Sequence, residues 1–138
     1  MNYWLLKTEP EEYSYDDLIK SKEGIWDGVR NYQARNNLNT INEDDLILIY
    51  HTGNEKAIVG IAKSSHKAFP DPSDPTETWV AIKLVPYKKL NKSVSLQEIK
   101  HDSFFSDFAL IKQSRLSVMP VSKVHFHRII EMGNTDII

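Results

Sequence analysis

The chain has 138 residues, of which 41% are hydrophobic and 26% are charged, with a formal net charge of −2 and no cysteine. These values are ordinary for a globular protein, and the length predicts one domain over residues 1–138. Without cysteine, disulfides, thiolate nucleophiles and cysteine zinc sites are excluded. The sequence starts without a signal-peptide pattern and has no apolar run long enough to span a membrane. We therefore expect a cytoplasmic protein with no membrane partner.

Charge is distributed unevenly along the chain. Residues 1–78 hold 8 basic and 14 acidic residues, whereas residues 79–128 hold 9 basic and 3 acidic residues. The second stretch is strongly basic, and such asymmetry suggests a basic face on the folded protein. Because the whole chain is slightly acidic, we expect any binding of a polyanion to be local and modest.

Hydrophobic periodicity and turn residues predict five elements in the first half of the chain. They are a strand over residues 2–7, a helix over residues 14–20, a helix over residues 29–41, a strand over residues 46–52 and a strand over residues 57–63. Ser14 and Asp17 have the spacing of a capping box at the first helix. A Gly53-Asn54 turn signal joins the last two strands into a hairpin, and the earlier of these strands reads as buried on both sides. The acidic residues 43–45 are interpreted as a solvated turn.

The second half predicts one long strand and several short elements. They are a proline-rich loop over residues 69–75, a strand over residues 77–89 that ends near Pro86, a helix over residues 95–100, a helix over residues 104–111, a strand over residues 116–119 and a helix capped by Ser122 and Gly133. In the last helix we expect Val124, Ile129 and Met132 to face the core. A central block of strands with short helices around it favours an α+β fold with a curled mixed sheet or small barrel.

Familiar catalytic and cofactor motifs are absent from the sequence. It has no phosphate loop, dinucleotide-binding glycine pattern, nucleophile elbow or HExxH zinc helix, and we expect neither a metal nor a cofactor. His125 and His127 lie two residues apart on a predicted helix, so they point to different sides and are a poor metal pair. His51 directly follows a buried strand, and it fits a pocket residue and a structural histidine equally well.

The segment from Ile25 to Asn37, IWDGVRNYQARNN, is the best candidate for a binding site. A tryptophan face can stack on a heterocycle, asparagine amides can bind its polar edge, and N–H groups at a helix start can hold a phosphate. Alternatively, Trp26 is a core residue, Asn31 satisfies a turn and the arginines pair with acids. Because tryptophan is usually buried whatever its role, composition alone favours this alternative.

Five segments give the sequence a close resemblance to the EVE domain, a family that includes the thymocyte nuclear proteins. They are YWLLKTEPEEYSYDDL, WDGVRNYQARNNL, DLILIYHTG, IVGIA and LIKQSRLSVMPVS, in this order from about Asn2 to Gly133. The resemblance implies a PUA-like fold, which is a small, curled, mostly antiparallel β-barrel with helices packed around it. It also implies kinship with YTH domains, which hold a methylated adenine in an aromatic cage. Some EVE proteins are implicated in recognising modified cytosines in DNA.

Together, the segment and the resemblance give a set of expected site residues. The expected base-binding residues are Trp26, Asn31, Tyr32, Tyr50, His51, Trp79 and Ser117. The expected phosphate ligands are Lys7, Arg30, Arg35 and Arg115, with Glu9 supporting the pocket. Trp79 is expected either to stand in for the second cage tryptophan of YTH domains or to be a core residue at the start of its strand.

The leading hypothesis is a non-enzymatic module that binds a modified nucleobase in DNA or RNA. The expected partner is a single-stranded or flipped-out nucleic acid, with separately encoded proteins as further candidates. One rival is a small enzyme acting on a nucleotide or a modified base, with Glu9 or His51 as the acid or base. Another is a scaffold protein with a vestigial pocket. For a eukaryotic source the expected location is the nucleus.

Overall fold

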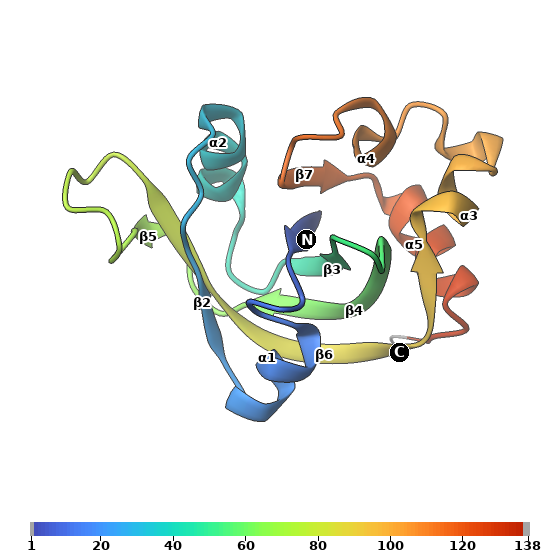
Figure 1. Cartoon of the computed structure of the whole chain (residues 1–138), viewed down its shortest axis with the longest axis horizontal. Coiled ribbons are helices and arrows are strands. Elements are labelled where there is room, and N and C mark those ends of the chain that lie inside the picture. The colour runs from blue at the N-terminus through green and yellow to red at the C-terminus, as the bar shows by residue number, and fades with distance from the viewer. Residues whose placement is uncertain (1, 137–138) are drawn as a thin grey trace.

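The chain folds into a curled sheet with short helices around it (Figure 1). The computed structural model describes residues 2–136. Within them the strands are β1 (Tyr3–Thr8), β2 (Gly24–Trp26), β3 (Leu46–His51), β4 (Ala57–Ser64), β5 (Phe69–Pro70), β6 (Val80–Ser95) and β7 (Val118–Val121). The helices are α1 (Tyr15–Ser21), α2 (Tyr32–Thr40), α3 (Leu96–Lys100), α4 (Ala109–Lys112) and α5 (Lys123–Met132), with a 3-10 turn, η1, at Ser103–Phe105. None of the helices within the described residues combines the length and apolar character needed to cross a bilayer.

The sheet has the strand order β2-β6-β4-β3-β1-β7, and β5 pairs with the start of β6. β1 and β3 run parallel, whereas the other described pairs are antiparallel. A parallel pair needs a long connection between its strands, and here α1, β2 and α2 lie within that connection. The architecture confirms the predicted α+β class and the predicted hairpin of β3 and β4.

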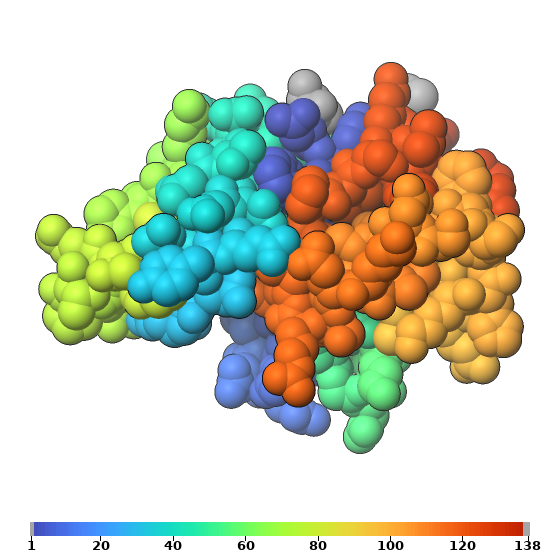
Figure 2. Space-filling model, turned by 90° about the horizontal axis from the view of Figure 1, so that it is seen from above, coloured from blue at the N-terminus to red at the C-terminus, as the bar shows by residue number. Residues whose placement is uncertain are grey.

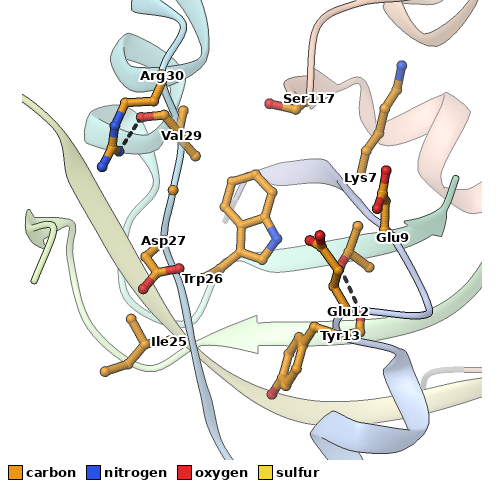
Figure 3. Close-up of a pocket in the computed structure, with 12 residues that line it drawn as sticks. Lys7, Glu9, Glu12, Tyr13, Ile25, Trp26, Asp27, Val29, Arg30 and Ser117 are labelled. Atoms are coloured by element: carbon orange, nitrogen blue, oxygen red, sulfur yellow. Dashed lines mark hydrogen bonds between the residues drawn. The ribbon is translucent and has the colours of Figure 1, made fainter. Parts of the chain in front are cut away.

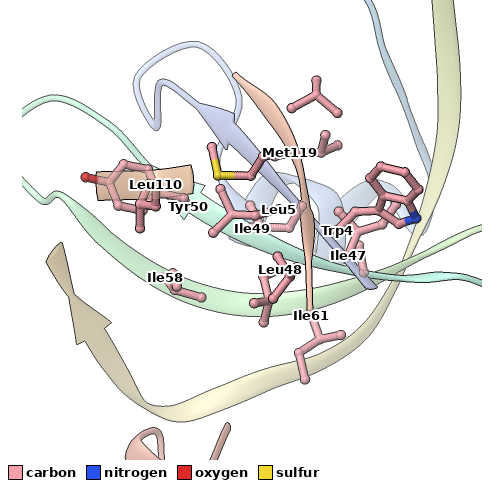
Figure 4. Close-up of a cluster of buried hydrophobic side chains, with 14 of the residues drawn as sticks. Trp4, Leu5, Ile47, Leu48, Ile49, Tyr50, Ile58, Ile61, Leu110 and Met119 are labelled. Atoms are coloured by element: carbon pink, nitrogen blue, oxygen red, sulfur yellow. The ribbon is translucent and has the colours of Figure 1, made fainter. Parts of the chain in front are cut away.

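Apolar side chains of β1, β3 and β4 form the centre of the core (Figure 4). All residues of β3 are buried, as the sequence predicts. Tyr15 at the start of α1 is also buried, and its hydroxyl donates to the Ile61 carbonyl at 2.7 Å. Burial raises the pKa of this phenol to about 12, so it stays neutral. The ring lies against Gly60, where an added Cβ would come within 2.6 Å of it, so only glycine fits there.

Short polar residues begin the helices where the sequence predicts them. Ser14 and Asp17 form the expected capping box of α1. Ser122 Oγ accepts from the His125 N–H at the start of α5. Gly133 ends that helix, and an added Cβ there would lie 3.0 Å from the Lys92 carbonyl oxygen.

The prediction of a solvated acidic turn is wrong for Asp45. This residue is only 2% exposed. Its carboxylate accepts from the Asn2 and Asn42 N–H groups and from the Trp4 indole N–H, at 2.9 to 3.0 Å. Three donors compensate for the burial of the charge. Two of them come from the first residues of the chain, far from Asp45 in sequence, so local composition did not reveal this role.

Three predicted strand boundaries are corrected. β6 does not end near Pro86 but runs on to Ser95, because its pairing with β4 shifts register at this proline, and such irregularities accommodate proline. β7 includes Pro120, which is tolerated because β7 is an edge strand. Phe69 and Pro70 form the short strand β5 and do not belong to the loop.

Two helix predictions are also corrected. Residues 104–111 form η1 and α4, separated by extended backbone at Phe108, because this break allows Phe105 and Phe108 both to be buried. In α5, Val124 is 61% exposed, and Phe126 faces the core in its place. Two residues correspond to about 200° around a helix, so these two side chains point to opposite sides.

Candidate functional site

A pocket of about 400 Å³ opens where β1, β2 and the chain before β7 meet (Figure 3). It is lined by Lys7, Thr8, Glu9, Glu12, Tyr13, Ile25, Trp26, Asp27, Gly28, Val29, Arg30 and Ser117. The expected site residues that it brings together are Lys7, Glu9, Trp26, Arg30 and Ser117. Three separate parts of the sequence therefore contribute to one pocket, which is called the Trp26 pocket below.

Trp26 is the central aromatic side chain of this pocket (Figure 3). β2 ends at this residue, and Gly28 (φ +78°) lets the chain turn away immediately afterwards. The indole is half-buried, and its Nε1–H has no hydrogen-bond partner among residues 2–136. By contrast, the Trp4 Nε1–H donates to Asp45. Trp26 is therefore a partly open ring with a free donor.

Charged side chains of both signs line the pocket together with the indole. Glu9, Glu12 and Asp27 contribute carboxylates, and Lys7 and Arg30 contribute cations. The turn that carries the two glutamates is fixed by its own backbone, because the N–H groups of residues 12 and 13 both donate to the Glu9 carbonyl, at 3.0 and 2.8 Å. The pocket lining thus combines the indole with hydrogen-bond acceptors and two cationic side chains.

Lys7 connects β1 to the chain before β7. Its N–H donates to the Ser117 carbonyl at 2.9 Å, and its ammonium donates to the Ser114 carbonyl at 2.7 Å. Burial lowers the pKa of this ammonium. In Figure 3 the side chain extends away from Trp26. Lys7 therefore connects β1 to residues 114–117 and stabilises one wall of the pocket.

A buried carboxylate holds residues 27–30 in place. The Asp71 side chain is fully buried, and its Oδ2 accepts from the Gly28 N–H at 2.9 Å and from Arg30 Nη1 at 3.0 Å. Its Oδ1 accepts from the N–H and hydroxyl of Ser73, at 2.7 and 2.6 Å. Burial alone would raise the pKa of Asp71, but these hydrogen bonds outweigh it and lower the pKa to about 2. Arg30, an expected phosphate ligand, is therefore engaged in an internal ion pair.

Trp79 does not line the Trp26 pocket. Its ring packs on Tyr32, with centroids 4.9 Å apart, and the Arg35 guanidinium lies over both rings, 4.8 Å from Tyr32 and 5.8 Å from Trp79. Asp74 fixes the start of β6 by accepting from the Trp79 N–H at 2.8 Å. Three expected site residues thus form a separate group, which is called the Tyr32 cluster below.

Asn31 and Arg115 lie in a groove of about 320 Å³ beside the Trp26 pocket. Asn31 is the N-cap of α2, and its Oδ1 accepts from the Ala34 N–H at 2.9 Å. Arg115 is exposed and has no hydrogen-bond or ion-pair partner among the described residues. The two chain segments that line this groove, residues 31–33 and 113–116, are adjacent in sequence to segments that line the Trp26 pocket.

Tyr50 and His51 are packed behind the pocket and do not line it. Tyr50 is 4% exposed, and burial raises its pKa. His51 Nε2 accepts from the Tyr15 N–H at 3.0 Å, and its Nδ1 lies 2.8 Å from Glu55 Oε1. The Tyr15 contact assigns the ring proton to Nδ1. His51 thereby holds the start of α1 against the sheet.

No cluster of three metal-binding side chains occurs within residues 2–136. His125 packs among Phe104, Phe105 and Phe108, whereas His127 lies at the edge of Tyr3. The two histidines therefore point into different surroundings.

Glu12, Tyr13 and Asp71 are among the residues that shape the pocket but were not expected from the sequence. Glu12 and Tyr13 lie in the segment YWLLKTEPEEYSYDDL, and its resemblance to the EVE domain was the available signal. For Asp71 the signal was the Asp-Pro-Ser order, because an Asp side chain often accepts from the N–H two residues on. Its contacts with residues 28 and 30 span more than 40 positions and have no local signature.

The curled mixed sheet with its surrounding helices defines a small PUA-like domain. The EVE domain family model matches residues 2–132, and the chain belongs to this family. Mouse thymocyte nuclear protein 1 is 29% identical over 169 aligned positions, which cover 98% of this chain and 75% of the mouse protein.

Solved structures extend this similarity to three dimensions. A Rhodopseudomonas palustris protein is 34% identical, with a TM-score of 0.92, over 97% of this chain and 94% of that one. Human THYN1, solved in complex with DNA that contains 5-methylcytosine, is 25% identical, with a TM-score of 0.88, over 99% of each chain. An ASCH protein from Zymomonas mobilis is 13% identical, with a TM-score of 0.58 over 95% of each chain, and shares the fold alone.

Proposed function

We propose that this chain binds a modified nucleobase of a nucleic acid, with the base held against Trp26. The observation that carries the proposal is the half-buried indole with a free Nε1–H, which lines a pocket that also contains carboxylates and cations. Every nucleobase has a π face that can stack on such a ring. The base must leave its own stack to enter, so the proposed ligand is single-stranded or flipped out. An intracellular location belongs to this proposal, because its ligand is a nucleic acid.

The size of the pocket supports one base as the occupant. Its volume of about 400 Å³ lies near the lower end of the range of roughly 300–1,000 Å³ that is typical of small-molecule sites. A single base fits such a volume. Recognition of a base pair within a duplex would not require a pocket. A methyl group on that base would add about 1–3 kcal/mol if it fills an apolar recess.

The polar groups of the pocket favour a base with an exocyclic amine. Carboxylates accept hydrogen bonds from the amino group of cytosine, and Glu9 and Glu12 supply two carboxylates on one side of the indole (Figure 3). We therefore assign the reading of the base edge to these glutamates. Asn31 is a weaker candidate, because its side-chain oxygen already caps α2.

We assign binding of the phosphate backbone to the groove that contains Asn31 and Arg115. Arg115 is free of intrachain partners in the described structure, whereas Lys7 and Arg30 are already bound to internal acceptors. A strand whose base enters the Trp26 pocket would then continue past the start of α2 toward Arg115. The N-terminus of that helix adds a favourable dipole for a phosphate.

The human relative supports a methylated cytosine in DNA as the first ligand to test. Its structure is that of a complex with 5-methylcytosine-containing DNA, and the two chains align over 99% of each. We carry this ligand over as a proposal, and RNA of the same sequence is the matched comparison.

The hydrogen bonds and the burial of His51 favour binding over catalysis. Both of its ring nitrogens have partners, and it is 7% exposed, so it does not offer a base to a ligand. The enzyme alternative then depends on Glu9 alone. Turnover of a modified nucleotide during prolonged incubation, followed by chromatography, would favour that alternative.

The test is a titration of single-stranded oligonucleotides that carry one 5-methylcytosine or one cytosine at the same position. Wild-type protein should bind the modified strand roughly 10- to 200-fold more tightly, as expected for one methyl group in a snug recess. Trp26→Ala should abolish this preference, whereas Trp26→Phe should retain part of it.

Thermal melting of each variant distinguishes lost binding from lost folding. The proposal fails if no modified strand binds better than its unmodified counterpart. It also fails if a folded Trp26→Ala variant keeps the full preference.

A further inference from the structure

The Tyr32 cluster lies beside the Trp26 pocket and outside it. Figure 2 shows the start of α2 and the loop between β5 and β6 side by side on one face of the molecule. Tyr32 comes from the former and Trp79 from the latter, and their rings are tilted by 38° at a centroid separation of 4.9 Å. Arg30 joins the two sites, because it lines the pocket and its guanidinium lies 5.7 Å from the Trp79 ring.

The tyrosine of this cluster is more open than a packing role requires. Tyr32 is 61% exposed, although Trp79 and Arg35 cover part of its ring. A tyrosine that only fastened a loop would bury most of its apolar area, since that burial is the source of its stabilising effect. An open aromatic face next to cations is the arrangement that single-stranded nucleic acid uses for stacking.

The charge of Arg35 is not neutralised by a carboxylate within the described residues. Its guanidinium donates to the Thr78 carbonyl at 3.2 Å and to Asn36 Oδ1 at 3.5 Å, both of which are neutral acceptors. Its Nε is buried without a partner, which is normally costly. The arrangement keeps a cation over two rings, where it complements a phosphodiester and a π-stacked base.

We infer that the Tyr32 cluster is a second nucleotide subsite, which stacks the base adjacent to the modified one and holds its phosphate with Arg35. The choice of ligand rests on the proposed function of the Trp26 pocket. Arg30 borders both sites, so consecutive nucleotides of one strand can occupy them. Because stacking does not depend on base identity, this subsite adds affinity without adding selectivity for the modification.

The test uses single-stranded oligonucleotides with 5-methylcytosine or cytosine at the centre and an abasic unit on its 5′ or 3′ side. For strands that carry a base at every position, Tyr32→Ala should weaken binding by roughly 5- to 150-fold. The loss should be equal for strands with 5-methylcytosine and with cytosine at the central position. An abasic unit on one side should cause the same loss in the wild type and no further loss in Tyr32→Ala. Val124→Ala is the matched control, because Val124 is equally exposed, at 61%, and lies on α5.

The inference is overturned if Tyr32→Ala leaves affinity unchanged, or if an abasic neighbour weakens the wild type and Tyr32→Ala to the same extent. These outcomes differ from failure of the proposed function. If Trp26→Ala removes the modification preference and Tyr32→Ala is silent, only the second subsite is refuted. If the wild type shows no preference but still responds to the abasic neighbour through Tyr32, only the modified-base proposal is refuted.

Discussion

Glu9 and Glu12 are the residues proposed to accept hydrogen bonds from the edge of the base. Both line the pocket, whereas Glu11 lies on the same turn and does not. Glu9→Ala or Glu12→Ala should weaken binding of a 5-methylcytosine strand by about 1.5–3 kcal/mol, the usual value of a hydrogen bond to a charged group. Glu11→Ala removes the same charge and should leave the preference for the modified strand unchanged. Equal effects of all three substitutions would show that only net charge matters.

Substitutions of Asn31 distinguish a helix-capping role of this side chain from a base-binding role. Its Oδ1 accepts from the Ala34 N–H, so Asn31→Ala should lower the free energy of unfolding by about 1 kcal/mol, whereas Asn31→Ser should preserve the cap. Urea unfolding measures both. Because Asn31 does not line the Trp26 pocket, Asn31→Ser should also keep the preference for a modified base. Loss of that preference at normal stability would restore the base-reading role that the family resemblance implied.

At the scale of elements, the pocket depends on a contact between two loops. Asp71, after β5, accepts from Gly28 and Arg30, which follow β2. Asp71→Asn should lower the free energy of unfolding by about 1–3 kcal/mol, because it weakens a buried charge-assisted contact. It should also weaken binding, since residues 27–30 form one wall of the pocket. Asp16→Asn is the control, because it removes an exposed carboxylate that pairs with Lys89 away from this pocket.

The same contact predicts a specific response to acid. The folded-state pKa of Asp71 is about 2, against about 3.9 for an unfolded chain. A group with a depressed pKa stabilises the fold above its unfolded value, and this contribution is lost as pH falls through the folded value. Stability should therefore decline between about pH 4 and pH 2, and this decline should be smaller in Asp71→Asn. An unchanged acid profile in the variant would show that Asp71 does not contribute.

The elements themselves could be predicted from sequence, because their signals are local. The apolar runs in residues 46–52 and 57–63, joined by the Gly53-Asn54 turn signal, predicted the hairpin, and the spacing of Ser14 and Asp17 predicted the start of α1. The errors arose where a distant partner decides the outcome. Asp45 is buried against donors from Asn2 and Trp4, and β6 passes Pro86 because a register shift against β4 accommodates it.

The site was predictable in part, for the same reason. Trp26 stood out through its unusual surroundings in the sequence, and it does line a pocket. The grouping of the other candidates could not be predicted, because Trp79 and Tyr32 are brought together only by the fold of the loop between β5 and β6. The family resemblance named residues near the pocket, but it did not separate pocket walls from residues such as Tyr50 that pack behind them.

In the whole molecule, the proposed ligand site is the Trp26 pocket, whereas the buried centre of the curled sheet provides stability. Trp4 and Trp26 illustrate these two roles, because Trp4 belongs to the buried centre and Trp26 to the pocket. Trp4 is 4% exposed and its indole N–H is bound to Asp45, whereas the Trp26 indole N–H is free among the described residues and borders the pocket. These two N–H groups therefore report on different parts of the molecule.

The most direct test of the central claim is to follow the indole N–H signals by ¹H–¹⁵N NMR while a 5-methylcytosine oligonucleotide is added. The Trp26 signal, assigned with Trp26→Phe, should shift and saturate with the same dissociation constant as binding, and the Trp4 signal should stay in place. Addition of the cytosine strand should require a higher concentration for the same shift. Saturable binding that leaves the Trp26 signal unmoved would show that the base is not held against Trp26.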